Sequence, residues 1–345
     1  MNQFRKQSFT KDPSLLGHEA VRQKLFGLLG SGKLPGSLLF AGPDAVGKRR
    51  VAFELAMREL CFRRTACGSC EGCLIFKAAP LPNVFPNLLR IAPEGKAGII
   101  KVDAIRGDAM VEGGVICWAH QAPPPGCHRW VVIEDAHRLG KSGANILLKT
   151  LEEPPLGTFF ILVTHRPESV LATIRSRSMR VPFAPLSEAE ATKVAQGNGW
   201  GGAELGAWAA MSNGTLKLLD RDAFDRASAQ MEAWLSIMEG APFAEASEAL
   251  LPDKKSDLAV SQQTLLALEQ LLVALKEAEQ ARLGLPGRLG AIGQWGARFS
   301  ALGGMELDIR RAFNYALESM RALQRNASPE LILRKIALAL QSAGH

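Results

Sequence analysis

The sequence lacks the features that place a chain in or across a membrane. Although 47% of its 345 residues are hydrophobic, no apolar run reaches the length of about 18 residues that a membrane-spanning helix needs. The opening stretch MNQFRKQSFT has no apolar core of the kind that a secretory signal requires. We therefore exclude a membrane-spanning class and expect a cytoplasmic protein.

Aromatic residues and a strong excess of one charge are also scarce. There are 15 Phe, 6 Trp and one Tyr, and Lys and Arg outnumber Asp and Glu by only 41 to 34. The net charge of +7 is compatible with a nucleic-acid partner, but the basic residues are spread along the chain and do not select that class. No Ser-His-Asp or Cys-His arrangement supplies a nucleophile, and there is no internal repeat.

Short apolar runs alternate with helical patterns between residues 36 and 183. Helices are expected at 48–60 and 143–153, and buried strands at 37–41, 87–91, 129–135 and 159–164. This alternation predicts an α/β fold in which a parallel sheet is flanked by helices.

The strand patterns stop after about residue 187. One helical face then carries Leu265, Leu268, Leu272 and Leu275, and the last helix is expected to begin at Pro329. A chain of this length holds two or three domains. We expect an α/β domain at 1–186, a small helical domain at 187–222 and an all-α domain at 223–345.

A glycine-rich loop follows the first expected strand. Gly42, Gly47 and Lys48 satisfy the pattern G-x-x-x-x-G-K, in which backbone N–H groups surround phosphate oxygens and the lysine adds a positive charge. The next residue is normally Ser or Thr, whose hydroxyl binds Mg²⁺, but here it is Arg49. The loop therefore predicts a phosphate-loop fold, and it makes the use of ATP and Mg²⁺ by this chain doubtful.

Two acids end the third expected strand, in WVVIEDAHRL. A Walker B strand normally carries Asp for the metal and then Glu to activate water, whereas this chain has Glu134 and then Asp135. The two side chains differ in length by one methylene, and catalysis at such a site depends on positioning. The alternative interpretation is a strand end with two solvated acids.

Four of the six cysteines lie within thirteen residues, in CFRRTACGSCEGC. Four thiolates with short x2 spacings suit a tetrahedral zinc ion, and clustering in a cytosolic chain favours metal over disulfides. We predict a structural zinc site with no open ligand position, in an insertion at 61–73. Its ligands are Cys61, Cys67, Cys70 and Cys73.

Arg177 lies between two serines near the end of the α/β region, in TIRSRSMRVPF. An arginine at such a place is usually a solvated charge. It is also the residue type that stabilises transition-state charge as an arginine finger in a neighbouring subunit's nucleotide site. Spacing alone leaves both interpretations open.

Taken in order, these segments resemble the bacterial clamp-loader branch of the AAA+ proteins, and within it the delta-prime subunits of DNA polymerase III. The resemblance is carried by the loop at 42–48, the four-cysteine insertion, and the segments SLLGHEAVRQKL (14–25), ANILLKTLEEPP (144–155), ILVTHRPESVLATIRSRS (161–178) and NASPELILRKIALAL (326–340). The most specific parts are LLKTLEEPP and the S-R-S version of the family's Ser-Arg-Cys motif. The cysteine cluster occurs in both delta-prime and gamma/tau subunits, so it does not separate them.

The resemblance implies an AAA+ module with a small helical lid, followed by a helical collar that joins five subunits in a ring. It makes Thr164 the sensor 1 position and Lys217 the sensor 2 position, which is normally arginine, and it directs Arg177 into the ATP site of an adjacent gamma/tau subunit. The implied partners are gamma/tau and delta, the sliding clamp through the complex, and primer–template DNA, held mainly by phosphate contacts. No membrane partner is implied.

Two other functions stay open at this point. One is an active gamma/tau-like loader ATPase with an unusual site. The other is a zinc-dependent nucleic-acid-binding module on an inert α/β domain. We rank a non-hydrolysing, stator-like subunit first, because Arg49, the Glu134–Asp135 order and Lys217 all depart from a working ATPase.

Overall fold

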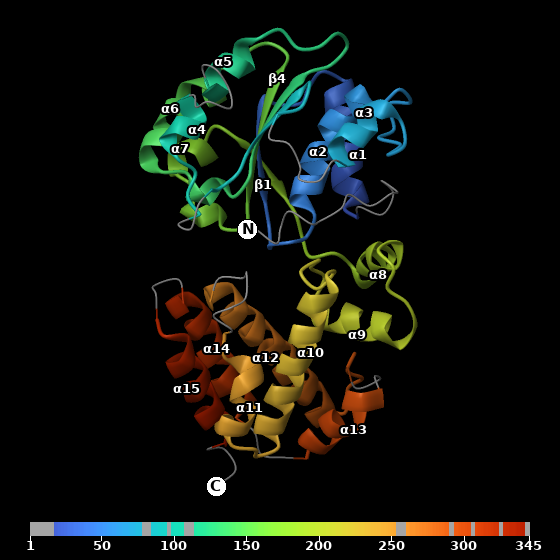
Figure 1. The fold of residues 1–345 in the computed structure, drawn as a ribbon, viewed down its shortest axis with the longest axis vertical. Helices are drawn as coiled ribbons and strands as arrows, with labels where there is room; N and C mark the ends of the chain where they lie inside the picture. The colour runs from blue at the N-terminus through green and yellow to red at the C-terminus, as the bar shows by residue number, and fades with distance from the viewer. Residues whose placement is uncertain are drawn as a thin grey trace. The chain divides into compact units, whose positions relative to one another are not determined.

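The computed structural model of the chain describes residues 17–77, 84–94, 98–106, 114–252, 260–289, 293–304, 308–323 and 327–341. Two compact units make up this part of the chain (Figure 1). The α/β unit extends to Asn198 and also includes Gly214–Leu216. The helical unit contains Gly199–Asn213 and the residues from Lys217 onward.

Five parallel strands form the sheet of the α/β unit, in the order β2-β3-β4-β1-β5. They are β1 (Ser37–Ala41), β2 (Leu88–Ile91), β3 (Arg129–Ile133), β4 (Thr158–Thr164) and β5 (Met179–Pro182). The first four confirm the expected strands to within two residues at either end. The fifth was not expected, because only Val181 of its four residues is buried and an edge strand of this kind leaves no apolar run.

Helices cover both faces of this sheet (Figure 1). Alternate side chains of β1 point to opposite faces, so Leu38 and Phe40 join one apolar cluster and Leu39 joins the other. The first cluster is covered by α1 (Glu19–Gly30), α2 (Lys48–Leu60), α3 (Glu71–Leu74) and the short turn η3 (Ile75–Lys77). The second is covered by α4 (Val102–Arg106), α5 (Gly114–His120), α6 (Lys141–Glu152) and α7 (Ala172–Arg175). The predicted α/β layer structure is thus confirmed.

A buried ion pair joins the first two helices. Arg22 of α1 donates from Nε and Nη2 to the two carboxylate oxygens of Glu54 of α2, at 2.7 and 2.6 Å. The Glu54 side chain is fully buried, and these two hydrogen bonds compensate for its removal from water. The pair fixes the helix that follows the glycine-rich loop.

The expected small domain at 187–222 is divided between the two units. Its first helix, α8 (Glu188–Gly197), belongs to the α/β unit and starts with a capping box in which Ser187 and Glu190 satisfy each other's backbone N–H groups. Its second helix, α9 (Gly202–Ser212), belongs to the helical unit.

In its described residues from Lys217 onward, the helical unit consists of helices and their connections. They are α10 (Arg221–Met238), α11 (Phe243–Leu250), α12 (Val260–Arg282), α13 (Gly293–Leu302), α14 (Ile309–Leu323) and α15 (Pro329–Gln341). The last begins at Pro329, as expected. Helix α12 contacts α10, α13, α14 and α15 and is buried around most of its circumference. Leu268 and Leu275 are therefore buried with residues outside the predicted face, such as Ala267 and Leu271. Among the described residues, no helix combines the length and the apolar character needed to cross a bilayer.

Candidate functional site

The glycine-rich loop links the carboxyl end of β1 to the amino end of α2, the setting that the sequence predicts for a phosphate loop. Gly42 must be glycine, because a Cβ there would lie 2.0 Å from the carbonyl oxygen of Phe183. Gly47 has a φ of +103°, a conformation that favours glycine. The buried Lys48 ammonium donates to the carbonyl oxygens of Gly42, at 2.9 Å, and of Pro43.

Two contacts hold the loop from outside. Ala45 adopts a left-handed φ of +54° at a position that is often glycine, and its carbonyl accepts a hydrogen bond of 2.7 Å from the Leu216 N–H. The Val46 carbonyl accepts from Nε2 of His18, also at 2.7 Å, and burial lowers the pKa of that histidine. Sequence reasoning missed His18, because a lone histidine before a helix carries no pattern that marks such a contact.

Glu134 is held by two arginines. Arg49 donates to its Oε2 at 3.3 Å, and Arg90 of β2 donates to Oε1 at 2.7 Å and to Oε2 at 3.2 Å. All three side chains are largely buried, with 12–18% of each side chain exposed. The structure thus brings together Arg49 and Glu134, two of the residues singled out in the sequence. It adds Arg90, which the sequence analysis missed because this residue lies within the apolar run NLLRI.

This arrangement engages both oxygens of the carboxylate that would face a metal ion. Mg²⁺ requires oxygen ligands in near-ideal octahedral geometry. Each charge-assisted hydrogen bond to Glu134 contributes about 1.5–3 kcal/mol, and a cation at this carboxylate would have to compete with two guanidinium groups. The geometry therefore opposes metal binding at Glu134.

Asp135 turns to different partners. Its backbone is left-handed (φ +48°, ψ +49°), and its Oδ1 lies 3.4 Å from Nδ1 of His165. Its Oδ2 lies 3.9 Å from Nε of Arg138. Burial raises the pKa of Asp135, but the hydrogen bond and charge of His165 outweigh this effect and hold that pKa below its ordinary value.

Thr164 is fully buried at the end of β4, and its hydroxyl lies 3.1 Å from Nδ1 of His137. The rings of His137 and His165 meet edge to face, with centroids 4.4 Å apart. Burial, together with the charge of His165, lowers the pKa of His137 to about 4, so this imidazole is neutral at pH 7. Asp135 and Thr164, both singled out in the sequence, are therefore linked through two histidines that were not.

Arg177 lies at the other end of the sheet from the glycine-rich loop. Leu38 of β1 is level with Met179 of β5, so Arg177 precedes the amino end of these parallel strands, whereas Gly42 follows the carboxyl end of β1. The five residues of β1 separate the two ends by about 13 Å. Arg177 donates from Nε to Glu152 at 3.1 Å and from Nη1 to the Thr173 carbonyl at 3.2 Å.

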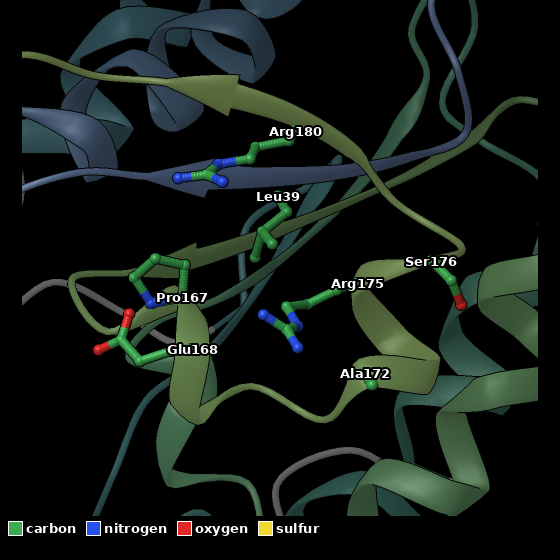
Figure 2. A pocket seen from close by; sticks show the side chains of 7 residues that line it. All are labelled: Leu39, Pro167, Glu168, Ala172, Arg175, Ser176 and Arg180. Carbon is green, nitrogen blue, oxygen red and sulfur yellow. The ribbon is translucent and has the colours of Figure 1, made fainter.

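A pocket of about 470 Å³ is lined by residues on both sides of Arg177 in the sequence, Arg175, Ser176 and Arg180 (Figure 2). In this view Arg175 extends from α7 toward Pro167 and Glu168, and Ser176 lies on the other side of that helix. The remaining lining residues are Leu39 and Ala172. The pocket thus brings together two arginines, Arg175 and Arg180, that flank Arg177 in the sequence.

Lys217, the expected sensor 2 position, belongs to the helical unit. Its ammonium lies 2.5 Å from Oε1 of Glu269 of α12. Both side chains are about one-third exposed, and an ion pair with that exposure contributes little to stability.

The four clustered cysteines come together after α2. Their four Sγ atoms all lie within 4.8 Å of one another, and those of Cys61 and Cys70 are 3.9 Å apart. Four sulfurs at about 2.3 Å from a tetrahedral zinc ion are about 3.8 Å from one another. Hydrogen bonds from Ser69 and nearby backbone N–H groups lower the pKa of Cys67 to about 5. Burial raises the pKa of Cys73, an effect that a bound cation would offset. The cluster is compatible with zinc.

Comparison with known proteins leads to the same family as the sequence motifs. Residues 17–187 match the family model described as DNA polymerase III, delta subunit. This part of the chain belongs to that family. The match covers most of the α/β unit and ends before the helical unit begins.

Curated relatives include both kinds of subunit that the sequence suggested. The chain is 33% identical to the DNA polymerase III subunit delta' of Pseudomonas aeruginosa, over 45% of this chain and 44% of that protein. It is 31% identical to the delta' of Escherichia coli K12, over 48% and 47%. It is also 33% identical to the gamma/tau subunit of Mycobacterium bovis, over 53% and 30%. The similarity thus spans less than half the length of each of these relatives.

Among solved structures, the chain is similar to a DNA polymerase III gamma subunit-related protein from Thermotoga maritima. The identity is 18%, the TM-score is 0.45, and the superposition covers 93% of this chain and 99% of that one.

Proposed function

We propose that this chain is a stator-like, delta-prime type subunit of a bacterial clamp loader, which acts in the cytoplasm and does not hydrolyse ATP by itself. It would assemble with gamma/tau and delta subunits to load a sliding clamp on primed DNA. Its family membership supports assembly into a clamp loader. One observation supports the proposed absence of ATP hydrolysis: Glu134 is held by Arg49 and Arg90.

The positive charge at the expected Mg²⁺ position is the reason to propose that ATP is not hydrolysed. An active phosphate-loop site needs Mg²⁺ between the loop hydroxyl and the Walker B acid, where it bridges the β- and γ-phosphates. Here a guanidinium replaces the hydroxyl, and the acid already pairs with two guanidinium groups. The loop shape and Lys48 still suit phosphate, so binding without cleavage is consistent with this geometry.

Arg177 would act in trans, on the nucleotide of an adjacent gamma/tau subunit. It lies at the opposite end of the sheet from its own glycine-rich loop, which argues against a role in the same chain's site. Its partner Glu152 is exposed over 58% of its side chain. An ion pair of this exposure contributes about 0–1 kcal/mol, so a phosphate can replace that partner.

The zinc ion would be structural and would be held by the four cysteines. Cys61, Cys73 and Phe76 belong to the apolar cluster that packs under α2, so an ion there would fix the insertion against the helix that follows the glycine-rich loop.

A gamma/tau-like ATPase is the second candidate, favoured by the similarity to gamma/tau and by the intact Gly42, Gly47 and Lys48. The two candidates differ in whether Mg²⁺ contributes to nucleotide binding.

The test compares binding of a fluorescent ATP analogue with Mg²⁺ and with chelator. We expect Mg²⁺ to leave the affinity of the wild-type chain unchanged. The double variant Arg49→Thr, Arg90→Ala frees Glu134 and restores the hydroxyl. We expect Mg²⁺ to tighten its binding about tenfold or more, because the ion can then bridge the loop hydroxyl, the acid and the phosphates. Arg49→Lys, which keeps the charge, is the matched control and should behave like wild type. Tightening by Mg²⁺ in the wild-type chain would support the ATPase instead.

A further inference from the structure

Three metal-ligating side chains meet at the carboxyl ends of β3 and β4, apart from the four cysteines. Asp135, His137 and His165 each offer one ligand atom within 4.8 Å of the other two. The register explains the meeting: Ile133 is level with Leu162, so Asp135 and Thr164 leave the sheet side by side and the two histidines follow. The non-hydrolysing role proposed above uses neither histidine.

The spacing of Asp135 and His165 matches first-row metal coordination. Ligand atoms about 2.1 Å from a tetrahedral zinc ion lie about 3.4 Å from each other. Oδ1 of Asp135 and Nδ1 of His165 are 3.4 Å apart. The left-handed backbone of Asp135, an uncommon conformation for a residue other than glycine, directs its carboxylate to this point.

The third ligand has an outer partner. A histidine that ligates a metal through one nitrogen usually donates a hydrogen bond from the other. Nδ1 of His137 lies 3.1 Å from the Thr164 hydroxyl, whose oxygen also accepts from the Arg166 N–H at 3.0 Å. When the hydroxyl oxygen accepts a hydrogen bond from the Nδ1–H group, Nε2 carries the lone pair that can bind a metal. The buried threonine is thus the outer hydrogen-bond partner of this ligand.

The charges around the cluster leave one carboxylate oxygen for the ion. Arg138 lies 3.9 Å from Oδ2 of Asp135 and also donates to the Gly98 carbonyl at 2.9 Å, so it faces the oxygen that His165 does not. The carboxylate side chain is 38% exposed and that of His165 is 22% exposed, so an ion can reach them from solvent.

We propose that Asp135, His137 and His165 form a second metal site, selective for zinc or a similar first-row transition metal, with an open fourth position for water. Two imidazoles and one carboxylate suit Zn²⁺ and are poor ligands for Mg²⁺, which prefers oxygen. The hydrogen bond of 3.4 Å from the Gly42 N–H to the Thr164 carbonyl ties this site to the start of the glycine-rich loop.

Equilibrium dialysis of the full chain, with its four-cysteine site loaded, against micromolar Zn²⁺ at neutral pH tests this proposal. Wild type should bind one equivalent of zinc more than the His165→Gln variant. His165 is partly exposed, so this variant should keep its fold, which its melting temperature will check. Asp135→Asn is a second variant with the same expectation. His120→Gln, an exposed histidine outside both clusters, is the matched control and should keep the extra equivalent.

Competition identifies the class of ion. A thousandfold excess of Mg²⁺ should not displace the extra zinc. Equal zinc binding by wild type, His165→Gln and Asp135→Asn would overturn the proposal. Displacement of the extra zinc by Mg²⁺ would also overturn it, because the site would then be an ordinary magnesium site.

Discussion

Replacing Arg177 by alanine should abolish most of the ATP turnover at the adjacent gamma/tau site when a clamp loader is rebuilt from cognate gamma/tau, delta and this chain. An arginine finger contributes about 10³–10⁵-fold to the rate of phosphoryl transfer, so the site that depends on Arg177 should fall by about 10³-fold or more. The measurement is ATP turnover stimulated by clamp and DNA, with assembly checked by gel filtration.

Two variants separate the finger from a general loss of positive charge. Arg175→Ala removes a neighbouring arginine that extends into the pocket of Figure 2 and should leave turnover close to wild type. Glu152→Gln removes the carboxylate that Arg177 contacts at 3.1 Å and should not slow turnover either. Unchanged turnover with Arg177→Ala in a fully assembled complex would make Arg177 a surface charge only.

Cys73→Ser should remove one equivalent of zinc from the purified chain and destabilise the α/β unit. Cys73 is fully buried in the apolar cluster under α2, and loss of a structural metal is among the changes with the largest effects on folding. We expect a loss of at least about 3 kcal/mol, which lowers the melting temperature of a unit of this size by about 6–12 °C.

The measurements are metal content by mass spectrometry and thermal unfolding. Cys117→Ser is the matched control: Cys117 is exposed and lies outside the cluster, so zinc content and melting temperature should stay at their wild-type values. Wild-type zinc content in Cys73→Ser would show that the four cysteines do not form the site.

The elements that were predicted well are those whose signal is local. β1 and α2 have the expected bounds, because the apolar run of the strand and the glycines before the helix are signals carried by neighbouring residues only. The four cysteines likewise come together within one short segment, so their spacing predicted their meeting.

The features that were missed depend on contacts across the fold. Arg90 reaches Glu134 from a neighbouring strand 44 residues away, and nothing in NLLRI marks it as a partner of an acid. His165 reaches Asp135 through the pairing of β3 with β4. The division of 187–222 was also not predictable, because α8 is tied to the first unit by a hydrogen bond from the His18 N–H to Glu190, 172 residues apart in sequence.

ATP turnover by the purified chain tests the central claim most directly, which is that the guanidinium groups on Glu134 exclude magnesium-assisted hydrolysis. The assay compares wild type with Lys48→Ala in the presence of Mg²⁺, since removing the lysine abolishes any turnover at this loop. We predict that wild type shows no turnover above the Lys48→Ala background. Magnesium-dependent turnover that Lys48→Ala abolishes would contradict the claim and make this chain a loader ATPase.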